Sequence, residues 1–151
     1  MQHLNYQPER CEALFHEKAA KALERLKPLA PPNPELHASI DSGYRLRAEF
    51  RVWHDGNDLH YVMFPPGEPR NPHIIEAFLI AGPRITEAMS PLREVLRGSI
   101  ELRRKLFQVE FLSTLSGELL ITLIYHRPLD DTWHAAAEIL ANSLACTVSY
   151  T

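Results

Sequence analysis

Three arginines and a tryptophan alternate with apolar residues in the run YRLRAEFRVWHDG, residues 44–56. Arg45, Arg47, Arg51 and Trp53 share one parity, so they lie on one face if this run is a β-strand. At ~3.3 Å per residue the arginines span about 20 Å, or several phosphate spacings along a nucleic-acid strand. Guanidinium groups bind phosphates through paired hydrogen bonds, and an indole ring stacks on a nucleobase. These residues form a candidate RNA-binding face.

The same run also fits a solvated strand face without a ligand. Glu49 has the parity of the arginines and can neutralise its neighbours. The formal net charge of the chain is −3, whereas nucleic-acid-binding domains are usually basic. Any RNA contact must therefore come from local clustering, and both interpretations stay open at this point.

A second group of cationic and aromatic residues is expected where another hairpin opens. The run RRK includes Arg103 and Lys105, just before Phe107, and His126 ends the next apolar strand. If the two strands pair, Phe107 and His126 lie near one another at the open end. Such a group suits a base that leaves an RNA loop. Alternatively, Phe107 is a core residue, because its parity matches that of the apolar residues two and four positions later.

The other reactive residues form no recognisable active site. The glycines are isolated, without a phosphate-binding loop or a nucleophile elbow. Cys11 and Cys146 lack the spacing of a zinc or iron–sulfur site, and two free thiols suit a reducing cytosol. His54 and His60 lie on opposite arms of a hairpin without a third ligand, and Asp130-Asp131 suit a helix N-terminus. The sequence therefore predicts no metal site and no catalytic residue in this chain.

The elements that position these residues follow from periodicity, glycines and prolines. We expect helices over residues 8–27, from Gly82 to a cap at Gly98, and from Asp130 to residue 144. Pro91 is expected to kink or divide the second helix. The expected strands are residues 44–52, 59–64, a short one within 73–78, KLFQVEFL (105–112), ELLITLIYH (118–126) and CTVSY (146–150).

This order of elements predicts an α+β fold, with a mainly antiparallel sheet built from two β-hairpins plus extra strands and with helices packed on it. The 151 residues suit a single domain. Residues 1–34 form an N-terminal helix and a proline-rich connector, and residues 35–151 form the sheet-containing body. Without a signal peptide or an apolar run of ~18 residues, a cytoplasmic protein is expected. The chain stops within its last strand, which suggests a piece of a longer protein.

Two stretches carry a family resemblance. YRLRAEFRVWHDGNDLHYVMF and LRRKLFQVEFLSTLSGELLITLIYHRPLDDTW closely resemble the N-terminal part of bacterial tRNA (uracil-5-)-methyltransferases. That family uses S-adenosylmethionine to make 5-methyluridine in the T-loop of tRNA. Its methyltransferase domain, with the cofactor loop and the nucleophilic cysteine, lies C-terminal to the matched segment. Neither Cys11 nor Cys146 lies in the nucleophile motif. The resemblance therefore implies a tRNA-recognition domain that binds no cofactor itself, in a full-length enzyme that uses S-adenosylmethionine.

The resemblance also implies that Arg51, Phe107 and His126 contact the tRNA T-arm near the flipped uridine. The remaining candidate RNA contacts come from the placement of charge and aromatic rings alone: Arg45, Arg47, Trp53, Arg103 and Lys105. Related ribosomal-RNA methyltransferases usually carry a barrel domain and a four-cysteine iron–sulfur site, which this sequence lacks. The alternative function is a non-enzymatic protein-interaction module without RNA contact, in which acidic residues across the sheet neutralise the arginines. The sequence does not determine the oligomeric state.

Overall fold

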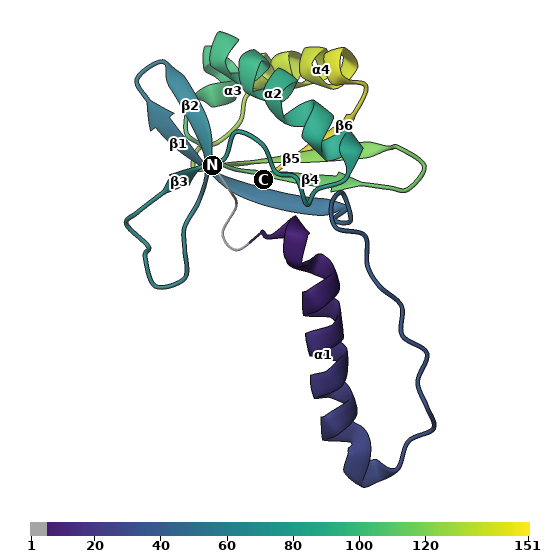
Figure 1. The fold of residues 1–151 in the computed structure, drawn as a ribbon. Helices are drawn as coiled ribbons and strands as arrows, with labels where there is room; N and C mark the ends of the chain where they lie inside the picture. The colour runs from purple at the N-terminus through teal and green to yellow at the C-terminus, as the bar shows by residue number, and fades with distance from the viewer. Residues whose placement is uncertain (1–5) are drawn as a thin grey trace.

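The computed structural model describes residues 6–151, and its centre is a six-stranded sheet with helices on one face (Figure 1). The strand order is β3-β2-β1-β4-β5-β6, and every neighbouring pair is antiparallel except β5 and β6. The predicted α+β fold with a mainly antiparallel sheet is confirmed. The strands are β1 (Arg47–Asp55), β2 (Asp58–Met63), β3 (His73–Ile74), β4 (Leu106–Ser113), β5 (Leu119–Tyr125) and β6 (Thr147–Tyr150).

The two predicted hairpins, β1–β2 and β4–β5, form the centre of the sheet. Asp55 pairs with Asp58, so a two-residue turn of Gly56 and Asn57 joins the first pair of strands. Gly56 has a φ of +59°, a left-handed conformation that glycine adopts without steric cost. The glycine at the tip of HDGND therefore sets this turn.

Helix α2 (Pro83–Gly98) begins directly after Gly82, with Pro83 in its first turn. The helix continues through Pro91, so of the kink or division predicted there, the division does not occur. A proline removes one backbone hydrogen bond, and buried Met89 and Leu92 anchor α2 on either side of it. Gly98 is the last helical residue and not the cap. Ser99 follows it and starts the short helix α3 (Ile100–Arg103).

Helix α4 (Asp131–Leu144) covers the same face of the sheet as α2 and α3 (Figure 1). The Asp130 carboxylate accepts a hydrogen bond from the Trp133 backbone N–H at 3.0 Å and caps the helix. Trp133, Ala137 and Leu140 are buried on the predicted apolar face. Asp130 and Asp131 thus lie at the helix N-terminus, as the sequence predicted, and Asp130 is the capping residue.

Alternation along the strands separates a buried face of the sheet from an accessible one. Ala48 and Phe50 of β1 and Phe111 of β4 point into the core beneath the helices. The intervening residues of β1, including the arginines, are exposed. The candidate residues of β1, Arg47, Arg51 and Trp53, therefore lie on the face of the sheet that α2, α3 and α4 leave uncovered.

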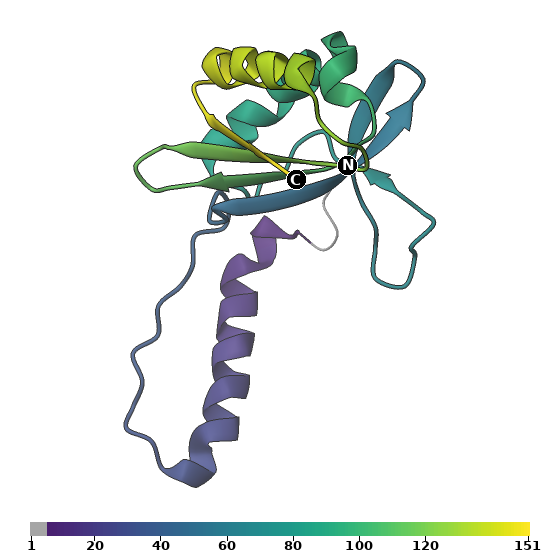
Figure 2. The same cartoon turned by 180° about the vertical axis from the view of Figure 1, so that it is seen from behind.

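Helix α1 (Cys11–Leu26) extends away from the sheet-containing body, between the 3-10 turns η1 (Pro8–Arg10) and η2 (Lys27–Leu29) (Figures 1 and 2). The predicted helix is confirmed, but none of its residues is buried. Leu23 and Leu26, from its apolar stripe, are 37% and 42% exposed. Within residues 6–151, no helix is long and apolar enough to cross a membrane.

Candidate nucleic-acid interface

Arg51, Phe107 and His126 form a three-layer stack at one end of the sheet. The Arg51 guanidinium carbon lies 3.5 Å from the centre of the Phe107 ring. The Phe107 and His126 rings are stacked, with centroids 4.0 Å apart and an angle of 30° between their planes. The structure thus brings together three residues that span 75 positions of the sequence, from Arg51 to His126. The predicted proximity of Phe107 and His126 is confirmed.

A β-bulge decides which way Phe107 points. The pairing of β4 with β5 shifts between Leu106 and Gln108, which leaves Phe107 as the extra residue. A bulge breaks the alternation of side chains and re-aims the inserted one. Leu106 and Val109 are buried, whereas Phe107 is only half-buried and faces Arg51. Phe107 therefore belongs to the uncovered face, although simple alternation would place it in the core.

Local hydrogen bonds fix the backbone around the bulge. A ring nitrogen of His54, Nε2, lies 2.8 Å from the carbonyl oxygen of Leu106. The backbone N–H of His126 donates to the carbonyl oxygen of Lys105 at 3.1 Å, which closes the open end of the hairpin. Lys105 has a left-handed φ of +59°, and its side chain is exposed. These contacts hold Phe107 and His126 next to each other.

The arginines of β1 differ in whether a carboxylate neutralises them. Arg47 Nη2 lies 3.2 Å from a carboxylate oxygen of both Glu49 and Glu110. Arg51, in contrast, has no carboxylate partner within the described part of the chain. Glu49 therefore neutralises only one of its two arginine neighbours, and Arg51 brings an unpaired positive charge to the stack.

The remaining candidate residues are spread around the stack. Trp53 lies two positions along β1 from Arg51, and its side chain is 49% exposed. Arg103 donates to the Arg97 carbonyl oxygen at 2.6 Å and to the Asn57 side-chain oxygen at 3.0 Å, so it ties α3 to the β1–β2 turn. Arg45 lies at the far end of the strand, where its backbone pairs with Ala81. Trp53 and Lys105 extend the stack region, whereas Arg45, Arg47 and Arg103 do not join it.

Two supporting residues were not identified from the sequence as part of this site. His54 was considered only as a metal ligand, and it holds the bulge instead. Arg127 donates to the carbonyl oxygens of Arg104 at 3.0 Å and Glu101 at 2.7 Å, which fixes the segment before β4. Both contacts join distant parts of the chain, so local patterns carry no signal for them.

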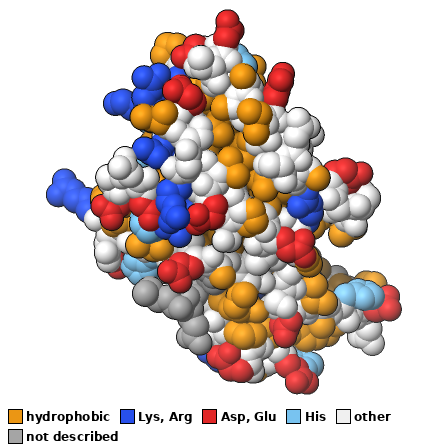
Figure 3. All heavy atoms as spheres, turned by 90° about the horizontal axis from the view of Figure 1, so that it is seen from above, with side chains coloured by type: hydrophobic (Ala, Val, Ile, Leu, Met, Phe, Trp, Pro, Cys, Tyr) orange, Lys and Arg blue, Asp and Glu red, His pale blue; other side chains and the backbone are white. Residues whose placement is uncertain are grey.

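The side of the molecule covered by helices carries charges of both signs (Figure 3). Figure 3 shows the side covered by helices, where basic and acidic side chains lie next to one another. Arg97 of α2 pairs with Glu94 at 3.0 Å and lies 4.0 Å from Asp58. These ion pairs offset the positive charge of Arg97.

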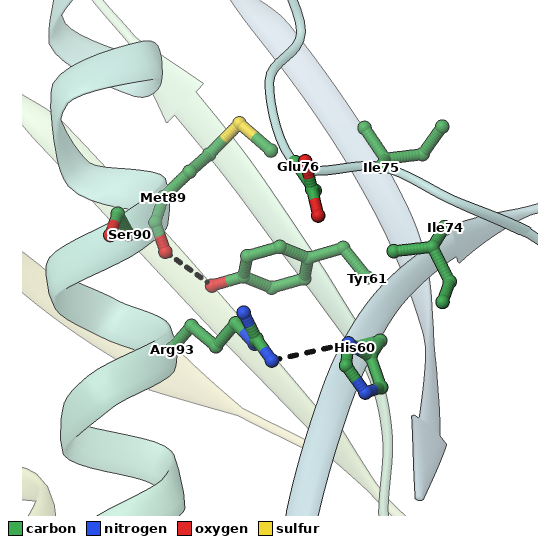
Figure 4. A pocket seen from close by; sticks show the side chains of 8 residues that line it. All are labelled: His60, Tyr61, Ile74, Ile75, Glu76, Met89, Ser90 and Arg93. Atoms are coloured by element: carbon green, nitrogen blue, oxygen red, sulfur yellow. Dashed lines mark hydrogen bonds between the residues drawn. The ribbon is translucent and has the colours of Figure 1, made fainter. Parts of the chain in front are cut away.

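A small cavity of about 160 Å³ lies between β2 and α2 (Figure 4). The Tyr61 hydroxyl donates to the Met89 carbonyl oxygen at 2.9 Å, and burial raises the pKa of Tyr61 above its ordinary value. Arg93 lies 3.1 Å from His60 Nδ1 and donates to Asp58 at 3.1 Å. These polar groups hydrogen-bond to one another. Their contacts join α2 to β2 and so support the β1–β2 hairpin.

The two histidines of the β1–β2 hairpin make separate contacts within the fold. His54 contacts Leu106 while His60 contacts Arg93, so the two histidines of the hairpin do not converge. No cluster of three or more potential metal ligands exists among residues 6–151. Cys11 and Cys146 are free thiols, and burial raises the pKa of Cys146 above its ordinary value. Neither thiol adjoins the stack.

Comparisons with known proteins indicate the family of this chain. The family model described as tRNA (Uracil-5-)-methyltransferase matches residues 10–149. The tRNA/tmRNA (uracil-C(5))-methyltransferase of Aromatoleum aromaticum is 55% identical over 128 residues, which are 85% of this chain and 35% of that protein. The enzymes of the same name from Ectopseudomonas mendocina and Dechloromonas aromatica are 50% and 47% identical, each over 92% of this chain and 38% of the relative.

The matched region includes every candidate residue, from Arg45 to His126. The chain spans little more than a third of the length of these relatives. Because the family model covers nearly all of the chain and the relatives are about half identical to it, this chain belongs to the tRNA (uracil-5-)-methyltransferase family.

Proposed function

We propose that this chain is the tRNA-recognition part of an enzyme that methylates carbon-5 of the T-loop uridine. In this proposal residues 1–151 act as one RNA-binding domain, and a C-terminal methyltransferase domain of the same protein performs the chemistry. Membership of the family and the partial coverage of its longer members support this division.

The Arg51–Phe107–His126 stack is the observation that carries the proposal. It combines two adjacent rings with a guanidinium that no carboxylate neutralises within the described residues. Single-stranded RNA loops are bound by such platforms, because every base has a face that stacks on a ring and every nucleotide has a phosphate that attracts a cation. His126, the exposed outer ring of the stack, would contact a base of the T-loop, and Arg51 would bind a neighbouring phosphate. Phe107, between the two, would hold both in place. The contacts would help the target uridine to leave its stack.

The S-adenosylmethionine that the family implies does not fit the residues of this chain. Its glycines occur singly, at positions 43, 56, 67, 82, 98 and 117, so they form no glycine-rich loop between a strand and a helix. We therefore assign cofactor binding and catalysis to the part of the enzyme outside this chain.

The test is a titration of a T-arm RNA hairpin with the chain, followed by fluorescence anisotropy. Phe107→Ala removes the ring that holds His126 and Arg51, and it is expected to weaken binding by about 5- to 100-fold, the range of one base–aromatic stack. Arg51→Ala is expected to lower the dependence of affinity on salt, because one phosphate contact is lost. Arg97→Gln on the helical side is the control and should bind like wild type. Equal affinity of wild type, Phe107→Ala and Arg51→Ala would refute the proposal.

The second candidate function is a protein-interaction module without RNA contact. It is favoured by Arg47, whose charge is offset by Glu49 and Glu110. It requires that Arg51 also be dispensable for RNA binding. Absence of any salt-sensitive binding to the T-arm hairpin would favour this alternative.

A further inference from the structure

A groove opens beside β1 at the end of the strand remote from the stack. β2 pairs with β1 only from Arg51 onward, so the earlier residues of β1 have no strand on that side. A cavity of about 600 Å³ occupies this gap. Met63 and Phe78 contribute apolar surface to it, and Tyr44 and Arg45 line it at the start of the strand. The groove thus continues the uncovered face of the sheet.

The backbone holds this part of the groove in place. Arg45 donates its N–H to the Ile80 carbonyl oxygen at 2.8 Å and accepts a hydrogen bond from the Gly82 N–H at 2.7 Å. A Cβ added to Gly82 would lie 3.6 Å from the Arg45 carbonyl oxygen, in ordinary contact. The Tyr44 ring, one residue earlier, is 48% exposed. The side chains of Tyr44 and Arg45 are therefore presented from a fixed backbone and do not hold the fold together themselves.

The chemistry of the groove matches one nucleotide. The Arg45 guanidinium makes no ion pair and no hydrogen bond with any residue in the range 6–151, whereas Arg47 on the wall is held by Glu49 and Glu110. Leu112 of β4 adds an apolar wall that is 47% exposed. Ligand sites typically combine such apolar walls with a few polar anchors. A base suits the aromatic and apolar surfaces, and a phosphate suits Arg45.

We propose that this groove binds a second nucleotide of the RNA whose target region contacts the Arg51–Phe107–His126 stack. Tyr44 stacks on its base, and Arg45 binds its phosphate. Six residues of strand separate Arg45 from Arg51, or ~20 Å at 3.3 Å per residue, so this nucleotide lies several positions away from the one at the stack. The inference rests on the proposed function, because it extends the same RNA contact along β1.

Three substitutions test the groove in titrations with the T-arm hairpin at several salt concentrations. Tyr44→Ala is expected to weaken binding about 5- to 100-fold through the loss of one stack. Arg45→Gln should reduce the slope of log affinity against log salt by roughly one. Leu112→Trp fills the groove and should weaken binding without removing any polar group. All three sites are exposed, and circular dichroism checks that each variant folds.

The outcomes separate this inference from the proposed function. If Phe107→Ala weakens binding while all three groove variants bind like wild type, the groove is not used and the inference is overturned. If Phe107→Ala and Arg51→Ala also bind like wild type, the proposed function fails, and the groove proposal with it. Weaker binding of the groove variants, with Arg97→Gln unchanged, supports the inference.

Discussion

Phe107 and Phe111 lie four residues apart on β4, but they face opposite sides of the sheet. Phe111 is fully buried and packs edge-on against Phe50 and Tyr61, with ring centroids 6.2 Å and 6.1 Å away. Phe107 is half-buried and contacts Arg51 and a histidine ring. Substituting each by alanine therefore measures how much free energy of unfolding each face contributes.

The expected losses in free energy of unfolding differ by more than a factor of two between the centres of their ranges. Phe111→Ala leaves a cavity in a packed core, which typically costs about 3–5 kcal/mol. Phe107→Ala removes a cation–π contact worth ~0.5–1 kcal/mol and an exposed ring stack of similar size, about 1–2 kcal/mol in all. With a urea m-value of ~2 kcal/mol/M, the unfolding midpoint should fall by roughly 2 M for Phe111→Ala and by less than about 1 M for Phe107→Ala.

Urea denaturation followed by far-UV circular dichroism measures both midpoints. The double variant Arg51→Ala/Phe107→Ala should recover a coupling energy of ~0.5–1 kcal/mol, because each single variant already breaks the same contact. If Phe107→Ala destabilises the chain as strongly as Phe111→Ala, Phe107 is a core residue. The bulge argument would then be wrong, and the stack would lose its accessible ring.

Three further predictions concern the remainder of the chain. Asp130→Ala removes the α4 cap and should lower the free energy of unfolding by about 0.5–2 kcal/mol, measured by urea denaturation; no change would contradict the capping role. Burial raises the pKa of Tyr125 to about 12. This pKa is above the value of ~10 in the unfolded chain, so the protonated tyrosine stabilises the fold fully below pH 10, and this contribution is lost as the pH rises to about 12. The free energy of unfolding should therefore fall less steeply over that range in Tyr125→Phe than in wild type, as urea denaturation at several pH values would measure. Trp53 is exposed and Trp133 is buried. Quenching of the tryptophan fluorescence by acrylamide should therefore be weaker than in wild type for Trp53→Phe and stronger for Trp133→Phe. The reverse order would contradict this assignment of the exposed tryptophan.

Most elements of the fold were predictable because their signals are local. Alternation identified β1 and both hairpins, a glycine and an asparagine gave the first turn, and Asp130 marked the start of α4. The error at Pro91 has a non-local cause, since buried residues on both sides keep α2 continuous through the proline. The apolar stripe of α1 identified the helix correctly, but it could not show that none of the helix residues is buried.

The sequence by itself determined which residue types share the uncovered face of β1, because the parity of a strand is fixed by its backbone. It also placed Phe107 and His126 at one end of a hairpin, because the two apolar strands and the short connection between them could be predicted from the sequence. Only the tertiary structure decided that Phe107 faces outward, since a bulge depends on how two strands pair and leaves no mark in parity. Likewise, only the arrangement of β1 beside β4 decided that Glu110 helps to neutralise Arg47 while Arg51 remains without a carboxylate partner in the described residues.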